Sequence, residues 1–272
     1  MERARLTKSV TFLNRILPFA GLLDLLCPPI CPVCSEVIEN STEPFCPTCI
    51  QKIVTPAGQF CLRCGGRRFV APNSNNADGC VRCRTTEFRF KRIIALGEYA
   101  NELRQLVLRM KTDRTGILAI AAARVLTLCR SAEWESVQAE YVVPVPMHRF
   151  RREERGVNSP DILAEELARQ LNIPFARHLV RRVHHTNLQY TLSQRARADN
   201  VRGAFALRSP SVFDHWFRRS IIGKNILLVD DIFTTGATCN EMAKVLLSAG
   251  VRSVTVAVLA RAEGRDYRRS PG

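Results

Sequence analysis

From about residue 91 onward, short runs of consecutive apolar residues alternate with stretches in which apolar residues recur every three or four positions. The short runs predict strands and the longer stretches predict helices. The expected strands cover residues 93–99, 141–145, 226–229 and 254–259. The expected helices cover residues 102–110, 117–129, 160–171 and 238–249. Because strands that alternate with helices are typical of a parallel sheet, we expect an α/β fold here.

The first third of the chain lacks these periodic patterns. It is rich in Cys, Pro, Gly and Asn, and residues 70–79 have the composition of a loop. Residues 12–26 are apolar enough to predict a helix that packs on the protein. The expected organisation is an N-terminal helical segment (1–26), a cysteine-rich module (27–90), an α/β domain (91–262) and a loose tail (263–272).

The N-terminal segment lacks the features of an export signal or a membrane anchor. Early positive charges precede an apolar run, but Asp24 interrupts the run and no small-residue cleavage site follows it. No apolar stretch reaches the roughly 18 to 20 residues that span a bilayer. We therefore expect no membrane insertion and a cytoplasmic location.

Nine of the eleven cysteines lie within residues 27–83. In a cytoplasmic protein, such a density indicates metal binding rather than disulfides. Eight of these cysteines form four C-x-x-C pairs, and each pair places two thiolates on one tight turn. The candidate metal ligands are Cys31, Cys34, Cys46, Cys49, Cys61, Cys64, Cys80 and Cys83.

Two such pairs complete a tetrahedral site of four sulfurs, which suits Zn²⁺. The pattern therefore predicts two structural zinc ions, with a redox role as the alternative. A closed four-thiolate site leaves no open position, so we expect no catalysis there. Pairing the first turn with the second and the third with the fourth is the simplest arrangement, and crossed pairing is the alternative.

The chain is strongly basic, with a formal net charge of +15 from 40 basic and 25 acidic residues. A basic surface attracts phosphates, nucleic acid and anionic lipid alike, so charge alone does not choose among these partners. A solvated basic face is an equally good interpretation.

The most specific motif in the chain is the run ILLVDDIFTTGAT at residues 226–238. An apolar strand ends in two acids, a turn of small hydroxyl residues follows, and a helix begins at Thr238. The exposed amides and positive dipole end of a helix start bind a phosphate. Gly236 permits the tight bend that brings those amides together. Thr238 and Glu241 have the spacing of a capping box, which fits this helix start.

The paired acids Asp230 and Asp231 would repel a phosphate unless they face something else. Vicinal sugar hydroxyls and a hydrated divalent cation are good partners for carboxylates. The motif therefore predicts a site for a phosphate attached to a ribose. The expected ligand-binding residues are Asp230, Asp231, Thr234, Thr235, Gly236, Ala237 and Thr238.

This run resembles the phosphoribosyl diphosphate (PRPP) signature of type I phosphoribosyltransferases. Together with the cysteine pairs and the runs VPVPMH (143–148), RREERG (151–156) and NVRGAF (200–205), it resembles the ComF family. That family includes a DNA-uptake competence protein and has a double zinc ribbon. The family usually has Gly-Phe-Asn-Gln after its arginine loop, where this chain has Gly-Val-Asn-Ser at residues 156–159.

The resemblance implies a type I phosphoribosyltransferase fold that binds PRPP with Mg²⁺. Lys111 and Arg114 lie where this fold places its diphosphate loop, and both are suitable cations for a departing diphosphate. The arginine loop, with Arg155, is a candidate cationic lid that excludes water. The alternative for both segments is a solvated charged loop. We expect catalytic roles for Asp230, Asp231, Lys111 and Arg155.

Two functions fit these features. The first is an enzyme that transfers the phosphoribosyl group to a nitrogen acceptor. The second is a non-catalytic accessory protein of DNA uptake that binds phosphate or single-stranded DNA and acts with a competence helicase. A regulatory protein that binds PRPP without turnover is a weaker third hypothesis. The sequence specifies neither the acceptor nor the oligomeric state.

Overall fold

The computed structural model describes residues 28–38, 43–56, 59–67, 80, 83, 86–147, 158–183, 199–208 and 220–262. The helix expected at 12–26, the loop expected at 70–79 and the tail expected at 263–272 lie outside these residues. The chain forms two compact units, Met1–Cys49 and Ile50–Gly272. All of the named strands lie in the second unit.

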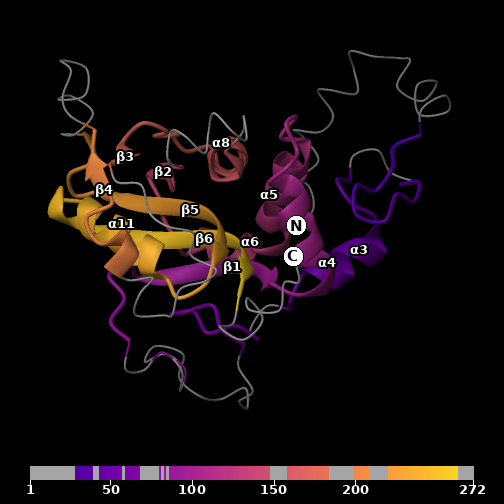
Figure 1. Cartoon of the computed structure of the whole chain (residues 1–272), viewed down its shortest axis with the longest axis horizontal. Helices are drawn as coiled ribbons and strands as arrows, with labels where there is room; N and C mark the ends of the chain where they lie inside the picture. The colour runs from indigo at the N-terminus through magenta and orange to yellow at the C-terminus, as the bar shows by residue number, and fades with distance from the viewer. Residues whose placement is uncertain are drawn as a thin grey trace, which may run out of the picture. The chain divides into compact units, whose positions relative to one another are not determined.

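A four-stranded parallel sheet with the order β1-β6-β5-β2 lies at the centre of the second unit (Figure 1). All three pairings are parallel. The strands are β1 (Arg92–Glu98), β2 (Tyr141–Pro144), β5 (Asn225–Phe233) and β6 (Ser253–Arg261). The expected α/β class is thus confirmed, with every predicted strand in one sheet.

The predicted helices are present as α4 (Asn101–Met110), α5 (Ile117–Cys129), α8 (Ser159–Leu171) and α11 (Ala237–Ser248). Four short elements of the described residues were not anticipated. They are the helices α3 (Pro47–Ile53) and α6 (Ser131–Glu135) and an antiparallel pair of strands, β3 (Val180–Arg182) and β4 (Phe205–Leu207). Elements of three to seven residues carry too few positions for a periodic pattern to emerge.

Helices cover both faces of the sheet. On one face, α5 and α8 pack against each other, and α4 packs beside α5. On the other face, α11 packs against β5 and β6 and also contacts β4 (Figure 1). None of the helices in the described ranges is long and apolar enough to cross a membrane.

The central strands are apolar on both sides because helices bury both faces. On the α11 side, Leu228 and Val256 are neighbours in the sheet and belong to the core with Met242 and Leu246 of the helix. The residues that alternate with these two along β5 and β6 point to the opposite face of the sheet, toward α4, α5 and α8. Strand β5 is therefore buried on both sides from Ile226 through Val229, and two acids follow, Asp230 and Asp231.

Strand β5 extends further than its apolar run suggested. We predicted a strand over residues 226–229 that ends before the acids, but β5 continues to Phe233. Asp230 pairs with Val258 and Phe233 pairs with Arg261, so β6 holds this extension on one side. Strand β2 ends at Pro144 opposite Val229, so the other edge of the extension has no neighbouring strand in the sheet.

A buried arginine fixes the segment that precedes the sheet. Arg130 is 2% exposed and donates to the carbonyls of Thr55, Ala95 and Leu96 at 2.6, 2.8 and 2.7 Å. These bonds replace the water that the guanidinium loses on burial. Nearby, a Cβ on Gly97 would lie 2.2 Å from the Ile53 carbonyl oxygen, so only glycine permits this approach.

Candidate ligand-binding cleft and metal clusters

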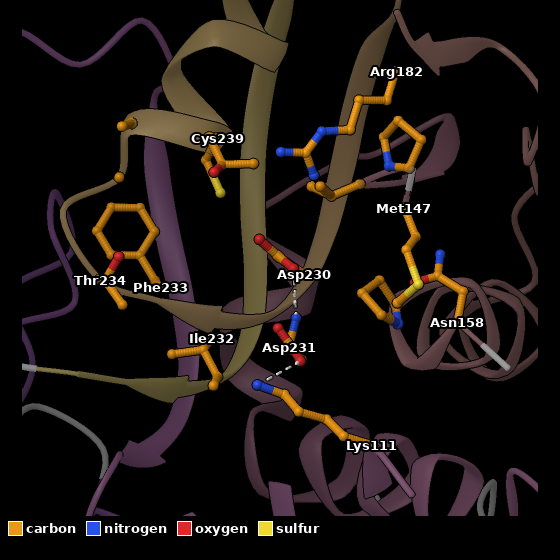
Figure 2. A pocket seen from close by; sticks show the side chains of 16 residues that line it. Lys111, Met147, Asn158, Arg182, Asp230, Asp231, Ile232, Phe233, Thr234 and Cys239 are labelled. Atoms are coloured by element: carbon orange, nitrogen blue, oxygen red, sulfur yellow. Dashed lines mark hydrogen bonds and ion pairs between the residues drawn. The ribbon is translucent and has the colours of Figure 1, made fainter. Parts of the chain in front are cut away.

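A cleft of about 170 Å³ opens where β2 and β5 end. The chain leaves β2 toward α8 on one face of the sheet and leaves β5 toward α11 on the other face. In open α/β sheets, ligands bind at such a switch point, outside the carboxyl ends of the strands. The lining residues are Lys111, Val145, Pro146, Met147, Asn158, Pro160, Arg182, Asp230, Asp231, Ile232, Phe233, Thr234, Gly236, Ala237, Thr238 and Cys239 (Figure 2).

The two acids of β5 point to opposite faces of the sheet, because successive residues of a strand alternate. Asp230 lies on the α11 side, and the backbone amide of Asp231 donates to its carboxylate at 2.9 Å (Figure 2). Burial and the nearby Asp231 carboxylate raise the pKa of Asp230 well above its ordinary value. The site therefore favours a cation or a hydrogen-bond donor beside this carboxylate.

Asp231 faces the end of α4, where Lys111 lies. The Lys111 ammonium is 3.8 Å from the Asp231 carboxylate, and the two side chains are 26% and 18% exposed (Figure 2). Two acids and two basic residues, Lys111 and Arg182, thus line a cleft that remains open to solvent (Figure 2). Arg114, four residues beyond Met110, is exposed and is not among the described residues that line the cleft.

The turn between β5 and α11 is shaped by Gly236, the N-cap residue of the helix. Its φ of +82° lies in the left-handed region, and an added Cβ would lie 2.5 Å from the Phe233 ring. Thr234, Ala237 and Thr238 line the cleft with it. The first amides of a helix have no intrahelical acceptor, so this turn directs N–H groups toward the cleft. Thr235 is not a lining residue, and its hydroxyl accepts from the Ala237 amide at 3.4 Å.

The capping-box prediction was wrong. Helix α11 begins at Ala237 rather than at Thr238, and no side chain caps it. The Glu241 carboxylate does not return to the helix start. It accepts from the Gly203 amide at 2.9 Å and lies 3.8 Å from the Lys244 ammonium. The left-handed Gly236 stands where a capping side chain would be, and the Thr235 hydroxyl accepts from the first amide of the helix, that of Ala237.

Asn158, at the start of α8, was not anticipated as a site residue. Its side-chain amide donates to Asp161 at 2.7 Å, and Arg177 holds the same carboxylate at 3.1 Å. Because the Asp161 carboxylate accepts this bond, the nitrogen of the Asn158 side-chain amide faces Asp161 and its oxygen faces away. The side-chain oxygen Oδ1 of Asn158 is buried and accepts no hydrogen bond from the described residues, although the residue lines the cleft. No local pattern in the sequence distinguishes it from an ordinary helix-cap asparagine.

Cys239 also lines the cleft, in the first turn of α11. Burial raises the pKa of its thiol well above the ordinary value, and the two nearby acids add to this effect. A thiol in this environment stays protonated at neutral pH and is a poor nucleophile. Arg155 and the rest of the expected lid, residues 149–157, lie outside the described residues.

The eight candidate cysteine ligands form two separate clusters. Cys31, Cys34, Cys46 and Cys49 form one cluster, and Cys61, Cys64, Cys80 and Cys83 form the other. In each, all four sulfurs lie within 4.8 Å of one another. This is the adjacent pairing of C-x-x-C turns that we considered simplest.

The sulfur geometry fits zinc and not disulfides. The sulfurs of Cys34 and Cys46 are 3.6 Å apart, and those of Cys61 and Cys83 are 3.7 Å apart. A tetrahedron with Zn–S bonds of about 2.3 Å has sulfurs about 3.8 Å apart, whereas a disulfide bond is about 2.05 Å. The Cys64 thiol and nearby amides lower the pKa of Cys61 to about 4, and the same hydrogen bond together with burial raises the pKa of Cys64.

The two clusters repeat one local structure. Ser35 and Gly65, each directly after a C-x-x-C pair, have φ values of +66° and +65°. Their amides donate to the carbonyls of Cys31 and Cys61, each at 2.7 Å. This turn aims backbone amides at the sulfurs of the pair. The chain therefore supports two structural zinc sites, one formed by each cluster.

Two family models match the chain. The double zinc ribbon domain matches residues 22–86, and the phosphoribosyl transferase domain matches residues 162–270. The fold, the cleft and these matches define a protein with a type I phosphoribosyltransferase domain and a double zinc ribbon.

Curated proteins similar to this chain carry the names of competence and DNA utilization proteins. The chain is 35% identical over 189 residues to Competence protein F of Haemophilus influenzae, which covers 68% of this chain and 80% of that protein. It is 31% identical over 185 residues to DNA utilization protein YhgH of Escherichia coli, a match that covers 67% of this chain and 77% of that protein. It is 35% identical over 109 residues to Competence protein ComFC of Bacillus subtilis, a match that covers 40% of this chain and 39% of that protein. The chain belongs to the ComF family.

Proposed function

We propose that the protein binds PRPP together with Mg²⁺ in the cleft between β2 and β5. The turn at Gly236 would hold the 5′-phosphate, because helix-start amides and the helix dipole favour an anion. Asp230 and Asp231 would hold the ribose hydroxyls directly or through Mg²⁺. Lys111 would face the diphosphate. The observation that carries this proposal is that the acids, the lysine and the glycine turn line one cleft.

The charge balance of the cleft supports a ligand that carries both phosphates and a cation. Lys111 pairs with Asp231 and Arg182 also lines the cleft, but a phosphate placed beside the two carboxylates still meets their repulsion at close range. A divalent ion between the acids and the diphosphate removes the repulsion. It also favours the charged form of Asp230, whose pKa burial and Asp231 raise.

Transfer would follow if an acceptor nitrogen approaches the anomeric carbon of the bound ligand. A bond from that carbon to nitrogen forms, the bond from that carbon to the diphosphate oxygen breaks, and the acceptor loses one proton. Lys111, with Mg²⁺, would stabilise the charge on the departing diphosphate. Arg114 and Arg155 remain proposed contributors, Arg155 from the lid that would exclude water.

Calorimetric titration with PRPP and Mg²⁺ tests the binding. We expect saturable heat with the unmodified chain and a large loss with Asp231→Asn or Asp230→Asn. Glu135→Gln removes a charge from an exposed position of α6 and serves as the matched control. Absence of heat with the unmodified, zinc-loaded chain would end the proposal.

Diphosphate release with a panel of nucleobases and amines tests the transfer. Release that depends on one acceptor and disappears in Asp230→Asn would establish an enzyme. Binding without release from any acceptor would favour a protein that binds PRPP without turnover.

The names of the relatives favour a second candidate, an accessory protein of DNA uptake. In this role, a cytoplasmic protein with a net charge of +15 would bind single-stranded DNA and act with a competence helicase. The affinity for DNA should then fall steeply with salt. DNA binding that survives Asp230→Asn and Asp231→Asn would support this role, and loss of DNA binding in these variants would assign DNA to the cleft instead.

A further inference from the structure

We propose that Arg261 is a positioning residue that connects the second zinc cluster to the phosphate-binding turn, so that metal at the cluster sets the affinity of the cleft. This inference rests on the proposed function for the identity of the ligand. The physical connection itself involves only the second compact unit and is measurable without any ligand.

Arg261 is the last residue of β6 and lies beside the end of β5. Its guanidinium reaches in two directions. The Nε group donates to the Cys64 carbonyl at 2.8 Å. One terminal nitrogen donates to the Thr234 carbonyl at 2.7 Å and to the Phe233 carbonyl at 3.3 Å. One side chain therefore joins a cysteine of the zinc cluster to the first residue of the phosphate-binding turn.

The same side chain packs on both parts. The guanidinium lies over the Phe233 ring, 5.1 Å from its centroid. On the zinc side, an added Cβ at Gly65 would lie 3.4 Å from the Arg261 side chain and 3.2 Å from Ile93. Gly65 follows Cys64 directly, so the C-x-x-C turn sits close against both β1 and Arg261.

A second path runs through the segment that follows Cys83. Phe88 stacks on Phe90, with ring centroids 4.8 Å apart, and meets Phe233 edge to face at 6.1 Å. The Phe88 ring also lies 3.0 Å from where a Cβ on Gly236 would be. Next to it, the Arg89 amide donates to the Asn240 side chain in α11 at 2.6 Å. The segment after the cluster thus contacts the turn that begins α11.

Arginine suits this position better than lysine. The planar guanidinium carries several N–H donors in a fixed arrangement, so one side chain holds carbonyls on two sides at once. A lysine ammonium is a point charge on a flexible stem and holds one of the two. The spacing of the two partners, and not the positive charge alone, makes Arg261 the connection.

Zinc fits the cluster that Arg261 contacts. The sulfurs of Cys64 and Cys80 are 3.6 Å apart and those of Cys80 and Cys83 are 3.8 Å apart, close to the edge of a zinc–sulfur tetrahedron. Four thiolates around zinc hold the C-x-x-C turns in place. Without metal, the Cys64 carbonyl loses its fixed position, and Arg261 no longer holds the turn at Thr234.

The first test measures hydrogen exchange without ligand. The Asn240 amide donates to the Gly236 carbonyl at 2.8 Å and reports on the start of α11. We expect removal of zinc with a Mg²⁺-sparing chelator to speed exchange at residues 236–240 in the unmodified chain. In Arg261→Met the exchange should already be faster, and zinc removal should add less than it does in the unmodified chain, because only the path through Phe88 and Arg89 remains. Unchanged exchange at α11 in the unmodified chain, while residues 61–66 open, would overturn the inference.

Two further variants separate geometry from charge. Arg261→Lys keeps the charge but bridges only one side, so it should behave more like Arg261→Met than like the unmodified chain. Arg252→Met removes an exposed arginine from the turn before β6 and should change nothing. If zinc removal changes exchange at residues 236–240 as much in Arg261→Lys as in the unmodified chain, the positive charge alone suffices and the positioning role is refuted.

The second test uses PRPP with Mg²⁺ and relies on reciprocity. If metal at the cluster strengthens ligand binding, the ligand must also protect the cluster. We expect Arg261→Met to raise the Kd about 5- to 50-fold with its zinc content unchanged. Ligand should slow exchange at residues 61–66 in the unmodified chain and not in Arg261→Met. Exchange at residues 31–35, in the first cluster, is the internal control.

The outcomes separate this inference from the proposed function. Coupled exchange without any binding of PRPP would leave the connection standing and remove the proposed ligand. Binding of PRPP with equal Kd in zinc-loaded and zinc-depleted chains would keep the ligand and overturn the connection.

Discussion

The Lys111 ammonium lies 3.8 Å from the Asp231 carboxylate, which joins the end of α4 to the extension of β5. These residues come from distant parts of the sequence: Lys111 is the C-cap residue of α4, and Asp231 lies in the last part of β5 (Figure 2). The pair holds a cation beside two acids before a ligand arrives. Binding of a diphosphate with Mg²⁺ would exchange this contact for stronger ones.

Lys111→Met should weaken the binding of PRPP about 10- to 100-fold, since a hydrogen bond to a charged group contributes about 1.5–3 kcal/mol. The melting temperature should change little, because a partly exposed ion pair contributes about 0–1 kcal/mol to stability. Titration calorimetry and thermal unfolding measure the two effects. Lys91→Met, at an exposed position before β1, is the matched control. A loss of stability without a loss of affinity would assign Lys111 a structural role instead.

Asp230→Asn should make the folded chain more stable at neutral pH. Burial and Asp231 raise the pKa of Asp230 above the ordinary value of 3.8, so the folded state holds a proton that the unfolded state has released. The ionisable Asp230 therefore lowers the free energy of unfolding more and more as pH rises from its unfolded-state pKa to its higher folded-state pKa. Asparagine avoids this cost and still accepts the Asp231 amide.

Thermal unfolding from about pH 3 to pH 8 measures the effect of Asp230→Asn. The melting temperatures of the variant and the unmodified chain should agree most closely at low pH and separate as pH rises. Glu135→Gln should show no such divergence. A difference that stays constant across this range would contradict the raised pKa of Asp230.

Gly236→Ala should destabilise the fold by about 2–4 kcal/mol and abolish ligand binding. The left-handed backbone alone costs a non-glycine residue about 1 kcal/mol or more. The added Cβ would also lie 2.5 Å from the Phe233 ring, so the turn must move. Gly203→Ala is the matched control, because it has a φ of +68° but nothing within 4 Å of the added Cβ. Denaturant unfolding measures the free energy of unfolding of Gly236→Ala and of Gly203→Ala. Equal losses of stability in the two variants would refute the steric argument.

Glu166→Gln should destabilise the α5–α8 contact by about 2–3 kcal/mol at neutral pH. Burial opposes the charge on Glu166, but hydrogen bonds from Arg169, Gln170 and Arg124 lower its pKa to about 2. Since the folded pKa is depressed, this stabilisation is present above the ordinary pKa of 4.5 and is lost as pH falls toward 2. Unfolding by urea at pH 7 and at about pH 2.5 should show the full penalty at pH 7 and a much smaller one at the lower pH, close to the folded pKa. An equal penalty at both pH values would mean that packing, and not charge, carries the contact.

Local pattern was sufficient for the main elements of the fold and of the candidate site. The apolar runs of β1, β2, β5 and β6 and the periodic faces of the long helices follow from burial on one or both sides. The run of residues 226–238 was informative because strand, acids, turn and helix start are consecutive. The C-x-x-C pairs were informative because metal geometry restricts their spacing.

Other features depend on neighbours that are far away in the sequence. Strand β5 continues through its two acids because β6 pairs with it there, which no propensity of Asp230 or Asp231 indicates. Gly236, and not the Thr238–Glu241 pair, begins α11, because Phe233 and Phe88 fill the space beside it. Asn158 became visible as a site residue only when its oxygen proved to be buried without a partner among the described residues.

The sequence by itself determined the α/β class and the two sets of four cysteines, and it predicted the residues of a candidate ribose-phosphate site, since each follows from a short-range pattern. Only the tertiary structure decided which of these residues meet. It brings Lys111 to Asp231, leaves Arg114 away from the described lining of the cleft, and places Arg261 between Cys64 and the turn at Thr234. The physical reason is that sheet order and helix packing set these distances, and neither is encoded in any single stretch of the chain.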